Sequence, residues 1–316
     1  MKKPVALVDL SHFLHTFRRS SRYSHMSRVV HVVTPLDNVF GWVRVPTGHV
    51  FGTVKVVWEL AQHFHAVILA VDSKSPHRYE ALPEYKSGRR TPTGDPFEDY
   101  SVYEDLKNIL AICTARPNVH YCKVDGMEAD DIIASLIKGS PEANWDLHCY
   151  FNDVDLLQTP GTYRWFSRPG SPEVVRAGYL YEKFKWEGDY LPLPYKVIKG
   201  DASDNIPSLI PRLRSAEVLK ICRKWVEEGS HTSNGHILGA MMGYTWSGAF
   251  AWVATALCDV DSDLYRALDR NFKVVCPQYV DWRTLPLKQL GYTVGAVNSL
   301  LETHYGFPAE DFYFPA

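Results

Sequence analysis

The chain has 316 residues, of which 46% are hydrophobic and 22% are charged, a composition typical of a globular protein with one or two domains. Its apolar runs are shorter than the roughly 18 residues of a membrane span, and Asp9 interrupts the first of them before a signal peptide could form, so we expect a cytoplasmic protein with no membrane partner. The net charge of −2 does not exclude DNA, because a carboxylate-rich site can be surrounded by lysine and arginine.

Short apolar runs alternate with helical patterns along the first half of the chain. The runs have the length of strands buried on both faces of a parallel sheet, and they are Val5–Leu10, Ala66–Val71 and Leu147–Phe151. Apolar residues at helical spacing predict helices over Thr53–Phe64, Tyr103–Ile112 and Glu128–Ile137. This order of elements predicts an α/β fold with a parallel-sheet core.

Three connections between these elements stand out. Residues 22–50 contain two apolar stretches and the sequence Pro46-Thr47-Gly48, which favour a hairpin and a turn. Residues 73–101 are polar and rich in proline and glycine, and long loops of this kind inside compact domains are usually functional. We expect a second mobile stretch over Glu227–His236.

Aspartates follow each of the three predicted strands. Asp9 ends the first, Asp72 follows the second, and Asp153 and Asp155 follow the third. A single aspartate after a strand is often only a turn or helix-capping residue. Because the carboxyl ends of parallel strands meet at one edge of the sheet, however, the repeated pattern predicts that these carboxylates converge there.

Two further acidic clusters lie elsewhere in the chain. Glu128, Asp130 and Asp131 begin a predicted helix, where a single acid would suffice to complement the helix dipole. Asp201 and Asp204 lie in a turn-rich stretch, where helix capping is the alternative interpretation. So many acids at one place would repel one another unless cations lay between them, so we expect a metal site.

Five segments in this order resemble the 5′-nuclease family, which includes viral 5′–3′ exonucleases, flap endonucleases and the 5′-nuclease domain of bacterial DNA polymerase I. The segments are VDLSHFL, LAVDSKSPHRYEALPEYKSGRR, DGMEADDIIASL, FNDVDLLQ and IKGDASDNIP. The resemblance spans residues 5 to about 210. It implies a parallel-sheet nuclease core over residues 1–187 with a helical arch at about 73–101. It further implies that residues 188–316 form a helical DNA-binding region, with a helix–three-turn–helix-like part, and an aromatic-rich C-terminal part. The size resembles the free-standing viral form, which implies a host cytoplasm.

The resemblance implies a set of metal-site carboxylates and a basic catalytic pair. The carboxylates are Asp9, Asp72, Glu128, Asp130, Asp131, Asp153, Asp155, Asp201 and Asp204. They would hold two Mg²⁺ ions, for which Mn²⁺ could substitute. Lys86 and Arg89 match the family's pattern Y-K-x-x-R and would offset charge on the reacting phosphate.

The implied DNA contacts fall into two groups. One group lies in the arch and comprises Arg78, Tyr85, Lys86, Arg89 and Arg90. The other follows Asp204 and comprises Arg212, Arg214 and Lys220. The family usually has glycines near 208, 212 and 214, where a backbone grips duplex DNA or K⁺. This chain has serine and arginines there, which argues against a K⁺ site.

The resemblance therefore implies a metal-dependent, monomeric 5′–3′ exonuclease or flap endonuclease acting in replication or repair. Its substrates would be DNA with 5′ flaps, nicks or free 5′ ends, and RNA–DNA hybrids as an extension. Three alternatives stay open. An aspartate-nucleophile phosphatase would use Asp153 and Asp155, but it leaves Asp72 and Glu128 unexplained. A non-catalytic DNA-binding protein and a smaller single-strand RNase are the others.

Overall fold

A computed structural model describes most of the chain, namely residues 1–33, 40–89, 92–159, 161–184, 192–227, 234–246 and 250–312. Arg90 and a large part of the stretch Glu227–His236 lie outside these ranges, so the predictions made for them stay predictions. Among the described residues, no helix combines the length and apolar character that crossing a bilayer requires.

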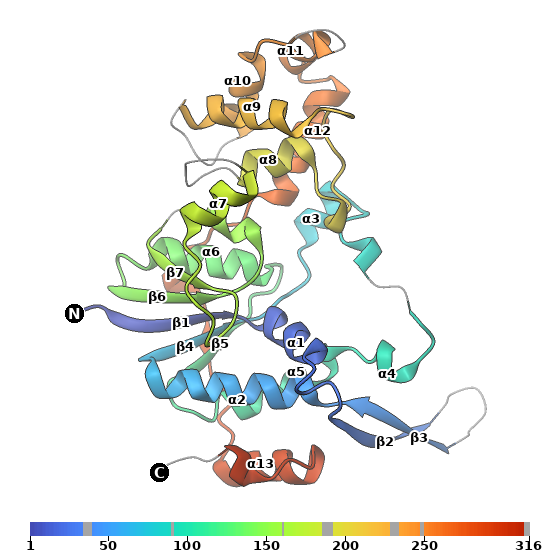
Figure 1. The fold of residues 1–316 in the computed structure, drawn as a ribbon, viewed down its shortest axis with the longest axis vertical. Coiled ribbons are helices and arrows are strands. Elements are labelled where there is room, and N and C mark those ends of the chain that lie inside the picture. Colours follow the sequence, from blue (N-terminus) through green and yellow to red (C-terminus); the bar gives the residue numbers. More distant parts are fainter. Residues whose placement is uncertain are drawn as a thin grey trace.

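The core is a six-stranded sheet with the order β7-β6-β1-β4-β5-β8 (Figure 1). Its strands are β1 Lys3–Asp9, β4 Ala66–Ala70, β5 Val119–Cys122, β6 Trp145–Tyr150, β7 Tyr163–Phe166 and β8 Leu287–Lys288. All neighbours run parallel except β5 and β8, which are antiparallel. The three predicted strands are therefore confirmed as β1, β4 and β6, and they are adjacent to one another.

Helices cover both faces of this sheet and build a separate region above it. The α-helices are α1 Leu10–Arg19, α2 Gly48–His63, α3 Pro76–Ala81, α4 Pro96–Asp99, α5 Leu106–Cys113, α6 Ala129–Gly139, α7 Arg176–Phe184, α8 Pro192–Lys199, α9 Ser215–Glu227, α10 Asn234–Met242, α11 Trp252–Cys258, α12 Asp263–Val275 and α13 Val294–Ser299. Shorter helical turns are η1 Ser87–Arg89, η2 Val102–Asp105, η3 Val154–Gln158, η4 Ala202–Asp204, η6 Trp282–Thr284, η7 Leu300–His304 and η8 Ala309–Phe312.

Alternation along β1 divides the hydrophobic core into two layers. Ala6 and Val8 point to the side of α1, α2 and α5, whereas Val5 and Leu7 point to the side of α6. Side chains of a strand alternate between faces, so a strand buried on both faces must be apolar at every position. The α/β core predicted from the uninterrupted apolar runs is confirmed.

Helices α8 to α12 share a third hydrophobic core that includes the fully buried Trp225. Leu82 and Tyr85, which come from the segment 73–101, pack into this same core. That segment forms short helical pieces, α3, η1 and α4, on one side of the molecule (Figure 1). The base of the expected arch therefore rests on the helical region rather than on the sheet.

The segment 22–50 contains the predicted hairpin, formed by β2 Ser27–Val33 and β3 Phe40–Pro46. The sequence Pro46-Thr47-Gly48 connects the hairpin to the next helix, because Pro46 ends β3 and Gly48 begins α2. Gly48 is required by a close approach, since a Cβ atom there would lie 2.1 Å from the carbonyl oxygen of Tyr23.

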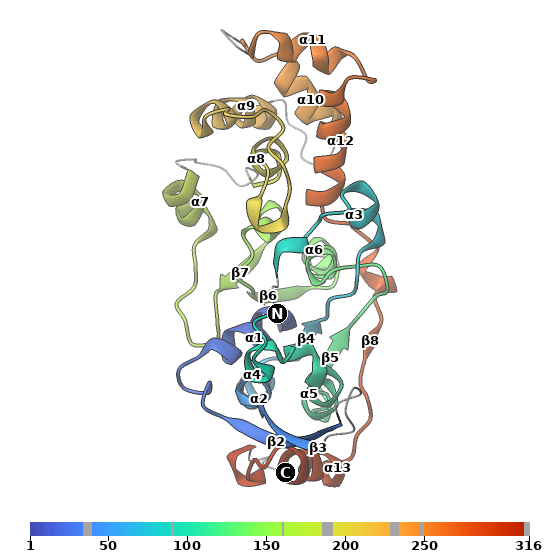
Figure 2. The ribbon, with the colours of Figure 1, turned by 90° about the vertical axis from the view of Figure 1, so that its right-hand side faces the viewer.

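After α12 the chain runs down one side of the molecule to the sheet (Figure 2). It adds β8 beside β5 and then places α13 and η8 beneath α2. The hydroxyl of Tyr305 donates to Asp105 at 2.8 Å, and Phe312 packs edge-on against Phe51 and Trp58. Residues 287–312 therefore lie on the sheet and its helices, although the sequence predicts them as part of the C-terminal region.

Candidate active site

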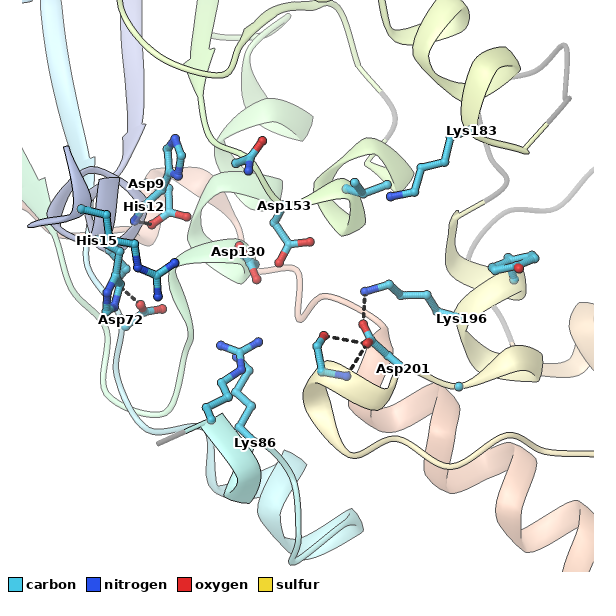
Figure 3. A pocket seen from close by; sticks show the side chains of 18 of the residues that line it. Asp9, His12, His15, Asp72, Lys86, Asp130, Asp153, Lys183, Lys196 and Asp201 are labelled. Carbon is cyan, nitrogen blue, oxygen red and sulfur yellow. Dashed lines mark hydrogen bonds and ion pairs between the residues drawn. The ribbon is translucent and has the colours of Figure 1, made fainter. Parts of the chain in front are cut away.

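Aspartates from three adjacent strands meet above the carboxyl edge of the sheet. Asp9 ends β1, Asp72 lies just after β4, and Asp153 lies just after β6. Asp130, from the first turn of α6, joins them. Figure 3 shows these four side chains around one cavity of about 860 Å³, which Asp201 and Lys196 border from the opposite side. The predicted convergence of strand-end carboxylates is observed.

Several of these aspartates also cap helices. Asp9 accepts a hydrogen bond from the amide of His12 at 3.0 Å, and Asp153 accepts one from Asp155 at 2.9 Å. Asp201 accepts one from Ser203 at 2.9 Å. The capping interpretation of these residues is therefore correct as well. A cap uses one carboxylate oxygen and fixes the side chain, so the second oxygen is held in a defined direction toward the cavity.

Asp72 joins two elements of the site. Its Oδ1 atom accepts from the amide of Ala129 at 2.8 Å, and its Oδ2 atom accepts from the hydroxyl of Ser11. The end of β4 is thereby tied to the starts of α6 and α1. These contacts keep Asp72 in place beside Asp9 without an ion pair among the described residues.

The pKa values of Asp9 and Asp130 are raised in this arrangement. Burial raises the pKa of Asp9 to about 7, and the neighbouring Asp72 and Asp153 add to the effect. The pKa of Asp130 is also raised, first by burial and then by Asp153 and Asp9. Each group resists ionisation first because it is buried and then because other carboxylates lie beside it, and a bound cation would favour its ionised form.

On the opposite side of the cavity an ammonium group already balances two carboxylates. Lys196 Nζ lies 2.6 Å from Asp155 Oδ2 and 2.5 Å from Asp201 Oδ2. Burial and Asp153 raise the pKa of Asp155 to about 7 despite this lysine. Burial also acts to raise the pKa of Asp201, but hydrogen bonds from Lys196 and Ser203 outweigh it and lower the value to about 2.

Glu128 and Asp131 lie slightly deeper and are held by residues of the segment 73–101. Arg78 binds both carboxylates at 2.6–3.0 Å, and Tyr85 and Lys86 donate to Glu128 at 3.1 and 2.9 Å. Arg78 and Tyr85 are only 3% and 4% exposed. Both side chains are therefore buried in this structure, and their contact with DNA stays a prediction. Positive charge in a polar segment suggested a surface contact, but the guanidinium serves the buried carboxylates.

Lys86 and Arg89, the predicted catalytic pair, both line the cavity, and their catalytic role stays a prediction. Lys86 has a positive φ of 57°, and its ammonium group lies against Glu128. Coulombic attraction to Glu128 outweighs the effect of burial and raises the pKa of Lys86. Arg89 pairs with Asp204 while half of its side chain stays exposed. Both cations therefore line the same cavity as the aspartates, and Figure 3 shows Lys86 there.

The structure adds cavity residues that the sequence analysis did not select. They are Ser11, His12, His15, Arg19, Tyr103, Lys183 and Lys196. Ser11, His12, His15 and Arg19 follow Asp9 on α1, and a helix that begins at a site residue brings its first turns to that site. Lys196 lies five residues before Asp201, at the end of α8, which is a spacing that could have been recognised.

The predicted duplex-binding residues lie apart from this cavity, around the start of α9. Arg212, Arg214 and Lys220 are all exposed, and Arg214 pairs with Glu217 at 3.2 Å. Arg212 has a φ of 65°, a conformation that favours glycine. The backbone therefore turns at 212 as it would with a glycine, although an arginine stands there. Lys199 Nζ donates to the carbonyl of Leu213 in the same turn at 2.9 Å.

Fit to a metal ion depends on how the oxygens are arranged. Across the described ranges, no three His, Cys, Asp or Glu side chains lie close enough together to bind one metal ion directly. Mg²⁺ commonly binds through one or two carboxylates and retains several waters, so the wide spacing suits it. Asp155 Oδ1 is buried and has no hydrogen-bond partner among the described residues, which leaves an oxygen available for a cation.

The sequence model described as "5′–3′ exonuclease, N-terminal resolvase-like domain" matches residues 23–184, just over half of the chain. The chain belongs to this family. A 5′–3′ exonuclease hydrolyses phosphodiester bonds, so the family is one of phosphodiester hydrolases. The suspected resemblance to 5′-nucleases is thereby confirmed.

Curated relatives of this 5′–3′ exonuclease family member include thermostable DNA polymerase I of Thermus aquaticus, 28% identical over 183 residues, and that of Thermus thermophilus, 27% identical. Each match covers 57% of this chain and 21% of the polymerase, so the chain spans about a fifth of these relatives. The 5′–3′ exonuclease of Aquifex aeolicus is 25% identical over 59% of this chain and 62% of that protein.

Solved structures share the fold over most of this chain. The T5 5′-exonuclease with bound zinc matches with a TM-score of 0.60 and 19% identity, covering 86% of this chain and 89% of that one. The T5 D15 flap endonuclease, in a product-like complex with DNA and metal ions, matches with a TM-score of 0.59 and 18% identity, covering 89% and 90%. These likenesses confirm the predicted α/β nuclease fold.

Proposed function

We propose that this chain is a divalent-ion-dependent 5′-nuclease that cleaves phosphodiester bonds near the 5′ ends of DNA, both as an exonuclease and at flaps. One observation carries the proposal. Four carboxylates, those of Asp9, Asp72, Asp130 and Asp153, face an open cavity and form no ion pair with another described residue. Ionised acids gathered this closely need cations, and a phosphodiester needs cations to bind near them.

Of the nine predicted carboxylates, some already form an ion pair with a lysine or arginine and others do not. Lys196 balances Asp155 and Asp201, Arg89 balances Asp204, and Arg78 balances Glu128 and Asp131. We therefore place the ions primarily at the four uncompensated aspartates, with Mg²⁺ as the expected ion and Mn²⁺ as a substitute. Two ions would activate a water as the nucleophile and stabilise the departing oxygen.

The cations of the chain would bind and orient the substrate. Lys86 and Arg89 stand at the cavity border, so either can donate to a phosphate that enters from solvent. To do so Lys86 would exchange its contact with Glu128 for one with the phosphate, and its ammonium would offset charge on the transition state. Arg19, Lys183 and Lys196 add positive charge around the same opening.

The substrate is proposed to be DNA because a family relative of the same fold was solved with DNA and metal ions. Exposed Arg212, Arg214 and Lys220 would contact the duplex phosphates, and affinity would fall steeply with salt. RNA–DNA hybrids, a role in replication or repair, a monomeric state and residence in a host cytoplasm belong to the same proposal.

The decisive test compares a 5′-labelled flap, a nicked duplex and an RNA–DNA hybrid, each with Mg²⁺, Mn²⁺ or a chelator. Asp153→Asn should lose cleavage by roughly a hundredfold or more because it removes an uncompensated ligand, while DNA binding persists. Lys86→Ala should slow turnover with a smaller effect on binding.

Full cleavage by Asp153→Asn would refute the site. Hydrolysis of a small phosphomonoester but not of DNA would favour the phosphatase, and metal-independent binding without cleavage would favour a DNA-binding protein.

A further inference from the structure

Asp130 and Asp131 are adjacent in the first turn of α6 but have opposite surroundings. Asp131 is fully buried, whereas Asp130 is only partly buried and faces the cavity that holds Asp9 and Asp153. Consecutive helix residues point about 100° apart, so one turn can present one acid to solvent and the other to the interior. The two carboxylates therefore cannot be assumed to share a role.

The carboxylate of Asp131 has no hydrogen-bonding capacity left. Its Oδ1 atom accepts from Arg78 Nη2 at 2.6 Å and from the amide of Gln278 at 2.8 Å. Its Oδ2 atom accepts from Arg78 Nη1 and from the amide of Glu128, both at 3.0 Å. A carboxylate offers about four lone-pair positions, and all of them are used. An ion could bind Asp131 only by displacing one of these donors.

The four donors come from three segments that are far apart in the sequence. Arg78 belongs to α3, Glu128 precedes α6, and Gln278 follows α12. Arg78 Nε also donates to the carbonyl of Val274 at 3.0 Å, which closes the contact between α3 and the end of α12. Asp131 thus joins α3 of the predicted arch, the start of α6 and the segment that returns to the sheet.

Asp130 shows the reverse pattern. Its side chain has no hydrogen bond or ion pair with any described residue, and it lines both the large cavity and the smaller pocket beside Glu128 and Asp155. Figure 3 shows its carboxylate next to that of Asp153. Its oxygens are therefore available to a ligand that carries positive charge.

We infer that these neighbours divide two tasks, Asp130 binding a divalent ion and Asp131 anchoring the arch, without contacting the ion. The inference rests on the proposed function, since it concerns the same ion site. It removes Asp131 from the nine carboxylates expected to hold metal and makes Arg78 a positioning residue, because Arg78 acts through Asp131 and Glu128.

The same substitution at both positions provides a matched test. Asp130→Asn and Asp131→Asn would be compared in the full chain by calorimetric titration with Mg²⁺ and Mn²⁺ without DNA. Thermal unfolding in chelator and hydrogen exchange would be measured alongside. For Asp130→Asn we expect at least tenfold weaker ion binding and an unchanged or higher unfolding temperature. For Asp131→Asn we expect a lower unfolding temperature, faster exchange in α3 and at residues 276–280, and ion affinity within about twofold of wild type.

Arg78→Lys decides the matter if Asp131→Asn does not fold. It keeps the charge and loses the two-pronged contact with Asp131, so unfolding should shift while ion affinity does not. Arg266→Lys, in the exposed pair with Asp263 on α12, is the control and should change neither. Tenfold weaker ion binding in folded Asp131→Asn or Arg78→Lys would overturn the division of tasks. Asp153→Asn distinguishes a failure of the proposed function from a failure of this inference. Wild-type ion affinity in that variant would overturn the proposed function itself.

Discussion

Lys196 Nζ lies 2.6 Å from Oδ2 of Asp155, so an ammonium group occupies part of a site expected to hold metal ions. The same nitrogen contacts Asp201 at 2.5 Å. In the absence of ions this lysine is the counter-charge of both aspartates. A lysine can move aside when ions or phosphates arrive, because its four-carbon stem is flexible.

Lys196→Met should therefore destabilise the ion-free protein more than the ion-loaded one. Two partly buried carboxylates would lose their partner, at a cost of about 1–3 kcal/mol after allowance for their partial exposure. Divalent ions should reduce this loss by replacing the ammonium. Thermal unfolding in chelator and in Mg²⁺ measures both values. Lys273→Met, in an exposed pair with Asp269, is the control and should cost less than about 0.5 kcal/mol. An equal loss with and without Mg²⁺ would contradict the expectation.

The raised pKa values of Asp9 and Asp155, both about 7, predict that the ion-free protein loses stability as pH rises from about 4 to 7. Over that range the unfolded chain releases protons that the folded chain retains, so ionisation favours unfolding. Each pKa unit of these shifts corresponds to about 1.4 kcal/mol of stability. The lowered pKa of Asp201 acts separately, below pH 4, where its stabilising contribution is lost as pH falls towards 2.

Urea unfolding at several pH values in chelator would measure this slope. Excess Mg²⁺ should flatten it, because a bound ion keeps the carboxylates ionised. Ion binding near pH 7 should also release protons, which calorimetry in buffers of different ionisation enthalpy detects. Stability that rises from pH 4 to 7 in chelator would be inconsistent with the burial of Asp9.

Arg212→Gly should stabilise the protein because residue 212 has a φ of 65°. The left-handed conformation costs a side-chain-bearing residue about 1–2 kcal/mol, of which the flexibility of glycine in the unfolded chain offsets part. We expect a net gain of about 0.5–1 kcal/mol by urea unfolding. Arg212→Ala removes the same charge but keeps the strain, so it should show no gain.

The two Arg212 variants also test the proposed DNA contact. If Arg212 binds a phosphate, both should lower the salt dependence of duplex binding by about one unit of slope. Arg266→Ala, in the exposed α12 pair, should leave that slope unchanged. Wild-type slopes in all three variants would remove Arg212 from the proposed interface.

Potassium should have little effect on duplex binding beyond its contribution to ionic strength. The ammonium of Lys199 already donates to the carbonyl of Leu213, in the turn where glycines are replaced. A built-in cation at that carbonyl leaves less need for a free one. Binding of a nicked duplex to the Asp153→Asn variant in matched KCl and NaCl measures this. An affinity several-fold higher in KCl would show that the turn still requires the ion.

The sequence predicts the carboxylate edge of the sheet well because the signal is local. Asp9, Asp72 and Asp153 each follow an apolar run, and parallel strands bring such positions together. The interpretation of single aspartates as helix caps is also correct, since one carboxylate oxygen can cap while the other faces the cavity. Capping and site formation are therefore compatible properties of the same residues.

The partners of these carboxylates could not be predicted in the same way. Arg78 lies in a polar, proline-rich segment, which indicates exposure, but its side chain is buried. The acids that it binds, Glu128 and Asp131, are 50 and 53 residues away in the sequence. Lys196 is a single cation in a helix, and only the packing of α8 beside η3 brings it to Asp155. Charge along the chain identifies candidate residues, but burial decides whether they face DNA or a carboxylate.

The returning C-terminal segment has a consequence for the nuclease core. Because β8 covers the outer side of β5, that strand does not present a row of unpaired backbone groups. Gln289 strengthens the closure by donating to the carbonyls of Arg116, Pro117 and Val119. Shortening the chain before β8 would therefore expose an open sheet edge able to recruit other chains, so self-association would be the first symptom of its loss.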